Sequence, residues 1–107
     1  MENLLRTGKH MNKLHELMVI TMEECGELTQ ACSKSIRRDE YINDKLVEEL
    51  GDVYCMIELM VENDLVTWDE LLERADVKRN KLKKWSKLID EESEIRRLSY
   101  HPQRRGY

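Results

Sequence analysis

Proline is nearly absent from this chain of 107 residues, which contains only Pro102. Glycine is also scarce, with four residues, and phenylalanine is missing altogether. Strands need turn residues about every eight to twelve positions, and the region before Pro102 lacks them. Strict alternation of polar and apolar residues, the other sign of strands, is absent too. We therefore expect an all-α fold.

Further absences exclude whole classes of protein. No run approaches the roughly 18 apolar residues that a membrane span needs, and the first residues show no pattern of a signal peptide. A net charge of −4 and a pI of about 5.4 argue against a basic surface for nucleic acid. The three cysteines cannot all pair and show no C-x-x-C spacing, so we expect them to be small buried hydrophobic residues in a reduced, cytoplasmic setting: Cys25, Cys32 and Cys55.

Length and composition allow a single small domain. Hydrophobic residues make up 40% of the chain and charged residues 37%. A chain this short forms a modest core alone, so we expect a homodimer or homotetramer. Residues 1–90 are expected to form the helical domain. Residues 91–107 are expected to form a polar tail, beginning as a frayed helix end.

Hydrophobic periodicity predicts long helices over residues 12–37 and 44–62, and a further helical face over residues 67–89. Asp39 or Asn43 can cap the second helix, and Thr67 with Glu70 forms a capping box before the third. The expected architecture is a bundle of about four helices in which the two long ones run antiparallel. The apolar stripe of the first helix is expected to consist of Leu14, Leu17, Met18, Thr21, Cys25, Leu28 and Cys32.

One acidic motif occurs twice. The segment EECGE at residues 23–27 recurs 25 residues later as EELGD at residues 48–52. In each copy one carboxylate borders the apolar stripe and a second lies one turn further along. Antiparallel packing would bring these four carboxylates into one cleft: Glu24, Glu27, Glu49 and Asp52.

A solvated acidic helix surface is the simpler alternative. Such a surface favours lysine four residues after each glutamate, whereas Glu23 and Glu24 are followed at that spacing by Glu27 and Leu28. Each copy also carries a mid-helix glycine, Gly26 or Gly51, which costs about 1 kcal/mol relative to alanine. Matched glycines indicate close approach of another backbone or a ligand. These features favour a metal site.

The type of ligand indicates which metal. Four carboxylates are hard oxygen donors that suit Mg²⁺ or Mn²⁺. A di-iron bundle uses Glu-x-x-His, and no such spacing occurs in the chain. A bound divalent ion would bridge phosphate oxygens and lower the pKa of a bound water.

The spacing Glu24-x-x-Glu27 and Glu49-x-x-Asp52, with 21 residues between the pairs, resembles the E-x-x-E…E-x-x-D signature of MazG-like all-α nucleoside triphosphate pyrophosphohydrolases. The resemblance extends over about residues 14–85. It implies an oligomeric helical bundle that splits a nucleoside triphosphate into the monophosphate and pyrophosphate. It further implies that those four acids hold Mg²⁺ or Mn²⁺.

The resemblance also implies phosphate-binding residues on the later helix. The segment KRNKLKKW at residues 78–85 is similar to the basic, asparagine-containing stretch of the family, which makes Lys78, Asn80 and Lys81 candidate substrate ligands. From the residues alone, Lys78 falls on the apolar stripe, where a lysine needs an anionic partner. A solvated basic helix end is the alternative.

The expected reaction is metal-assisted hydrolysis of a phosphoanhydride. Glu23 or Glu48 would orient or deprotonate the attacking water, and Lys78 and Lys81 would stabilise the leaving pyrophosphate. A deoxynucleoside triphosphate is the expected substrate. The alternative from another class is a non-catalytic helical oligomerisation or adaptor module, which has no need of a doubled acidic motif. A helix-turn-helix DNA binder is disfavoured by the charge.

Overall fold

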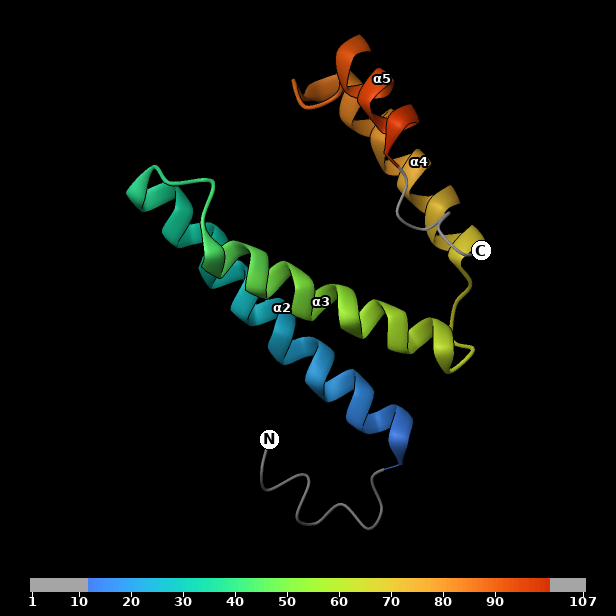
Figure 1. Ribbon diagram of the computed structural model, residues 1–107. Coiled ribbons are helices and arrows are strands. Elements are labelled where there is room, and N and C mark those ends of the chain that lie inside the picture. The colour runs from blue at the N-terminus through green and yellow to red at the C-terminus, as the bar shows by residue number, and fades with distance from the viewer. Residues whose placement is uncertain (1–11, 101–107) are drawn as a thin grey trace. The chain divides into compact units, whose positions relative to one another are not determined.

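The structure, a computed structural model, describes residues 12–100. This part of the chain contains four helices and no strand: α2 (Lys13–Arg38), α3 (Asp44–Glu62), α4 (Trp68–Trp85) and α5 (Glu91–Ser99) (Figure 1). The expected all-α class is confirmed. None of these helices combines the length and the apolar character that crossing a bilayer requires.

Local capping residues fix where the long helices begin. Asn12 Oδ1 accepts a hydrogen bond from the His15 N–H at 2.8 Å, and Asn43 Oδ1 accepts one from the Leu46 N–H at 2.8 Å. Such caps satisfy backbone donors that the first helical turn leaves unpaired. Asn43 is therefore the N-cap of α3. The bounds of α3 agree with the predicted range of residues 44–62.

Asp39, the other candidate N-cap, instead ends α2. Its φ of 52° lies in the left-handed region, which is usually occupied by glycine. The Asp39 N–H donates to Ile36 O at 3.2 Å, and the Glu40 N–H donates to Ser35 O at 3.1 Å. This paired arrangement is a Schellman motif, and it turns the chain toward α3.

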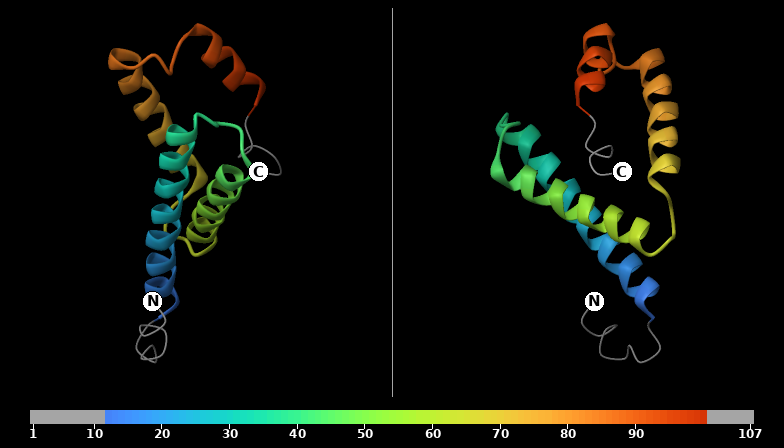
Figure 2. Two further views of the ribbon diagram at one scale, coloured as in Figure 1. Left: turned by 90° about the vertical axis from the view of Figure 1, so that its left-hand side faces the viewer. Right: turned by 45° about the vertical axis from the view of Figure 1, so that its right-hand side comes forward.

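The chain divides into two compact units, one ending at Leu65 and the other starting at Val66. In the first unit α2 and α3 lie side by side in every view (Figures 1 and 2). On each helix one set of buried or half-buried residues recurs at steps of three and four, the spacing of a helix-packing seam. On α2 they include Leu17, Thr21, Glu24, Leu28, Ala31 and Ser35, and on α3 they include Leu46, Glu49, Val53, Met56 and Met60.

This seam corrects the predicted stripe. Leu14, Met18, Cys25 and Cys32 are exposed rather than packed, because the polar residues Thr21, Glu24 and Ser35 take positions in the seam. Cys55 is exposed as well, so the expectation that all three cysteines are buried was wrong.

The second unit contains a break that periodicity does not predict. Helix α4 begins with the expected Thr67–Glu70 capping box but ends at Trp85, before Ile89. Ser86 is extended, and its Oγ accepts a hydrogen bond from the Leu88 N–H at 3.0 Å, which competes with helix continuation. Asp90 and Ser93 then form a second capping box. The expected frayed end is therefore a separate helix, α5, while residues 101–107 of the predicted tail lie outside the described residues.

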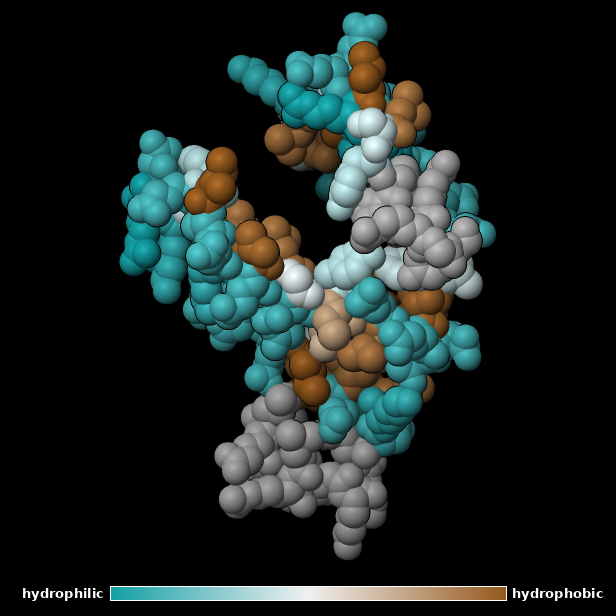
Figure 3. All heavy atoms as spheres, viewed as in Figure 1, coloured by the Kyte–Doolittle hydropathy of each residue, from teal (hydrophilic) through white to brown (hydrophobic). Residues whose placement is uncertain are grey.

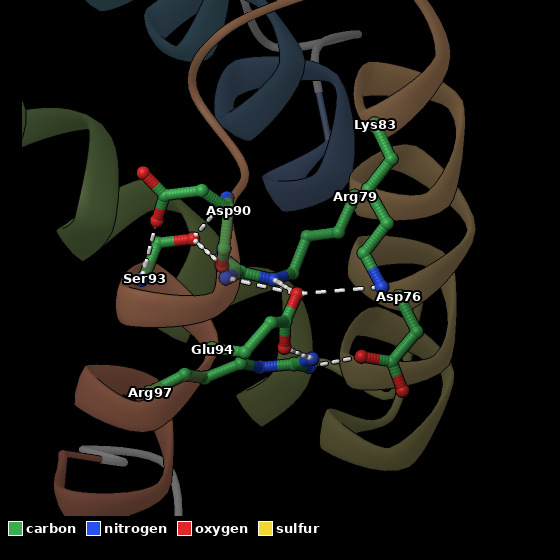
Figure 4. Close-up of polar contacts among 7 residues, drawn as sticks. All are labelled: Asp76, Arg79, Lys83, Asp90, Ser93, Glu94 and Arg97. Carbon is green, nitrogen blue, oxygen red and sulfur yellow. Dashed lines mark hydrogen bonds and ion pairs between the residues drawn. The ribbon is translucent and has the colours of Figure 1, made fainter.

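Ion pairs join α4 to α5 (Figure 4). Glu94 Oε1 lies 3.4 Å from Arg79 Nη2 and 3.7 Å from Lys83 Nζ, and Arg97 pairs with Asp76. Pairs of this kind at a surface stabilise modestly, typically by about 0–1 kcal/mol. No residue of either helix is buried, although apolar residues of α4 such as Leu82 are half-buried.

Candidate metal centre

Three acids of the doubled motif meet in the first unit. Glu24 of α2 and Glu49 and Asp52 of α3 each offer one carboxylate oxygen, and these oxygens lie within 4.8 Å of one another. Glu27, the fourth predicted ligand, is exposed and is not among them. We call Glu24, Glu49 and Asp52 the acidic triad.

The helix seam explains why these side chains converge. Glu24 and Glu49 occupy seam positions on their helices, so packing of α2 on α3 directs both toward the contact between the helices. Asp52 follows Glu49 by three residues, which places the two on one face of α3. The convergence therefore depends on spacing within each helix and on the packing of the pair.

Glu49 is the most buried of the acids, with an exposed fraction of 3%. Its Oε1 lies 3.4 Å from Lys45 Nζ, one turn earlier in α3. Its Oε2 is buried and has no hydrogen-bond partner among the described residues. Leaving a buried acceptor unsatisfied costs about 1–3 kcal/mol. A buried, unpartnered oxygen on a carboxylate that lies close to two others is suited to a cation.

Partial burial and the neighbouring carboxylates both raise the pKa of Glu24. Its pKa lies above the ordinary value, first because partial burial penalises the charged form and then because Asp52 and Glu49 repel that charge. A hydrogen bond with Asp52 and the charge of Glu27 act in the same direction. Glu27 thus influences the triad electrostatically from outside it. A divalent cation would relieve this repulsion.

Sequence reasoning overlooked Lys45. Its ammonium lies 3.1 Å from Glu48 Oε2 and 3.4 Å from Glu49 Oε1. The hydrogen bond and charge of Lys45 lower the pKa of Glu48, and those of Glu48 and Glu49 raise the pKa of Lys45. The signal was present three and four residues before the two glutamates. A lysine before the glutamates neutralises them as well as one that follows, so the cluster carries less unbalanced charge than the spacing after each glutamate indicates.

The glycines do not have the expected role. A Cβ built on Gly26 or Gly51 meets no described atom within 4 Å. The close approach predicted beside the acids is absent from this chain's described residues, because both glycines are on exposed faces of their helices, away from the seam.

The remaining predicted residues are not members of the triad. Glu23 is exposed, and Lys78, Asn80 and Lys81 are exposed on α4, in the second unit. Lys78 was expected to need an anionic partner, but its ammonium lies 5.9 Å from the centre of the Trp85 ring. This is within the range of a cation–π contact. The role of these residues toward a substrate stays a prediction.

The donor set fits a hard divalent cation. Three carboxylates with oxygens at close range, one of which, Glu49, also carries a buried and unpartnered oxygen, match the ligands that Mg²⁺ and Mn²⁺ prefer. No histidine belongs to the group, which disfavours softer metals. No known family, curated protein or solved structure matches the chain.

Proposed function

We propose that the protein is a metal-dependent nucleoside triphosphate pyrophosphohydrolase, with Glu24, Glu49 and Asp52 holding Mg²⁺ or Mn²⁺. The observation that carries the proposal is the acidic triad with its buried, unpartnered Glu49 oxygen. The resemblance of the doubled motif to MazG-like pyrophosphohydrolases supplies the reaction class. In the proposal α2 and α3 run antiparallel, and Glu27 adds negative charge near the triad.

When bound, the cation supplies Lewis acidity, which neutralises charge on phosphate oxygens and makes water a stronger nucleophile. The triad positions that charge beside the helix seam. Glu23 is the better candidate to accept the proton of the attacking water, because Lys45 lowers the pKa of Glu48 and so weakens it as a base. Lys78 and Lys81 would stabilise the departing pyrophosphate, with Asn80 as a further phosphate ligand.

A screen of nucleoside and deoxynucleoside triphosphates with Mg²⁺ or Mn²⁺ tests this proposal. Pyrophosphate and the nucleoside monophosphate are the expected products, with a deoxynucleotide preferred. Release of orthophosphate would point to a different phosphatase chemistry. Absence of turnover on every nucleotide with both metals would contradict the proposal.

An oligomerisation or adaptor module is the second candidate. Large apolar side chains are exposed on the helix pair, which favours a protein partner. They include Leu14, Met18, Met22, Val47 and Leu50. In the enzyme proposal this surface joins copies of the chain into a dimer or tetramer. Thermal unfolding separates the candidates, since an adaptor without a metal site would not be stabilised by millimolar Mg²⁺ or Mn²⁺.

A further inference from the structure

A cationic cavity lies where α2 turns into α3. It encloses about 190 Å³ and is lined by both helix ends and their connection: Ala31, Lys34, Ser35, Arg38, Glu40, Asn43 and Lys45. The small residues Ala31 and Ser35 are buried at this end of the seam, which leaves the space open. Since one water takes about 30 Å³, the cavity has room for a group of several heavy atoms. Mostly hydrophilic residues cover this end of the helix pair, at the left in Figure 3.

The cavity carries an excess of positive charge. Three cations and a single acid line it, and neither Lys34 nor Arg38 makes an ion pair with a described residue. The cavity also adjoins the N-terminus of α3, where the helix dipole favours an anion. Asn43 Nδ2 donates to Ser35 Oγ at 3.1 Å, which fixes a polar floor between the cations. Two unpaired cations around a polar cavity are suited to an oxyanion.

Lys45 connects this cavity to the acidic triad. Its side chain lines the cavity, and its ammonium lies 3.4 Å from Glu49 Oε1. The acidic triad and the cationic cavity thus share Lys45 as a neighbour within one unit of the fold. A metal-bound polyphosphate presents just this combination, with one phosphate near the cation and the next needing positive partners.

We propose that this cavity binds phosphate groups of a polyphosphate, with Lys34 and Arg38 as its charged ligands. Phosphate binding at this cavity does not depend on the proposed function. Only the identity of the polyphosphate, the tail of a nucleoside triphosphate, rests on that function. It adds a phosphate site in the same unit as the triad, separate from the residues predicted on α4.

Titration of the metal-free protein with inorganic pyrophosphate tests the site, using Lys34→Gln/Arg38→Gln as the variant. The matched control is Lys13→Gln/Lys87→Gln, which removes the same charge from two exposed lysines that do not line the cavity. We expect the cavity variant to weaken pyrophosphate binding by at least about tenfold, since charge-assisted contacts are lost. The control should bind like the wild type. Lys34→Arg/Arg38→Lys, which keeps both charges, should recover most of the affinity.

Three results would overturn the proposal. They are equal weakening in the cavity and control variants, unchanged binding in the cavity variant, and no pyrophosphate binding by wild type at millimolar concentration. Circular dichroism of each variant distinguishes loss of the site from loss of the helices.

Kinetics with a hydrolysed nucleotide separate this inference from the proposed function. If the cavity holds the substrate's tail, the cavity variant should raise KM by about tenfold while Mn²⁺ binding stays unchanged. Hydrolysis with an unchanged KM would remove the cavity from the substrate site and leave the enzyme proposal intact. Pyrophosphate binding at the cavity without hydrolysis of any nucleotide would support the cavity site and contradict the enzyme proposal.

Discussion

Replacing Glu49 by glutamine should make the metal-free protein more stable. The carboxylate is 3% exposed and its Oε2 lacks a partner, at a cost of about 1–3 kcal/mol. Glutamine keeps the shape and places an amide that can donate to the carboxylates of Glu24 and Asp52. Loss of the ion pair with half-exposed Lys45 offsets part of this gain. A net gain of about 1–2 kcal/mol is expected, and each kcal/mol raises Tm by about 4–8 °C in a domain of this size.

With divalent metal present, wild type should become more stable than Glu49→Gln. At a concentration about 100 times Kd, binding to the folded state stabilises by about 2.7 kcal/mol, and Glu49→Gln should lose most of that increase. The assay is thermal unfolding with and without Mn²⁺, and the matched control is Glu58→Gln, which removes a half-buried acid of α3 outside the triad. A Glu49→Gln variant that is less stable than wild type without metal would show that Glu49 serves only its ion pair with Lys45. An unchanged metal shift in that variant would refute the site.

Other expected outcomes concern the glycines, pH and assembly. Gly26→Ala and Gly51→Ala should each stabilise the protein by up to about 1 kcal/mol in denaturant unfolding, since a Cβ meets no described atom there, and loss of stability would show a contact supplied by another chain or a ligand. The folded-state pKa of Glu24 is raised, so its contribution to metal-free stability is present at low pH and is lost as pH rises through that pKa. The Tm of Glu24→Gln should therefore fall less than that of wild type as pH rises through this range. Identical dependence of Tm on pH in variant and wild type would contradict the raised pKa of Glu24. Light scattering should give a mass above the 12.8 kDa of one chain, because the helix pair exposes large apolar side chains, whereas a monomer at micromolar concentration would refute assembly.

Sequence reasoning located the long helices well because their ends depend on local chemistry. Asn43 and the Thr67–Glu70 box are recognisable from residue type and spacing alone. The end of α4 was missed because Ser86 and the Asp90–Ser93 box interrupt a stretch whose apolar spacing continues. Hydrophobic periodicity indicates which face of a helix is apolar, but it does not indicate where one helix ends and the next begins.

The triad was only partly predictable. Apolar spacing put Glu24 and Glu49 at the border of a stripe, whereas they lie in the packing seam itself together with Thr21 and Ser35. Hydrophobic patterns assign a glutamate to the exposed face of a helix, so the burial of Glu49 could not be deduced. Glu27 shares the motif spacing of Asp52 but remains outside the triad, because spacing within one helix does not fix what the partner helix approaches.

The most direct test of the central claim is metal-dependent hydrolysis by Asp52→Asn, measured beside wild type and Glu58→Gln. The account predicts that wild type and Glu58→Gln release pyrophosphate from a nucleoside triphosphate at similar rates with Mg²⁺ or Mn²⁺. Asp52→Asn should be slower by at least about a hundredfold, the loss expected when one strong electrostatic contribution is removed. Wild-type turnover by Asp52→Asn would contradict the assignment of the acidic triad as the catalytic metal site.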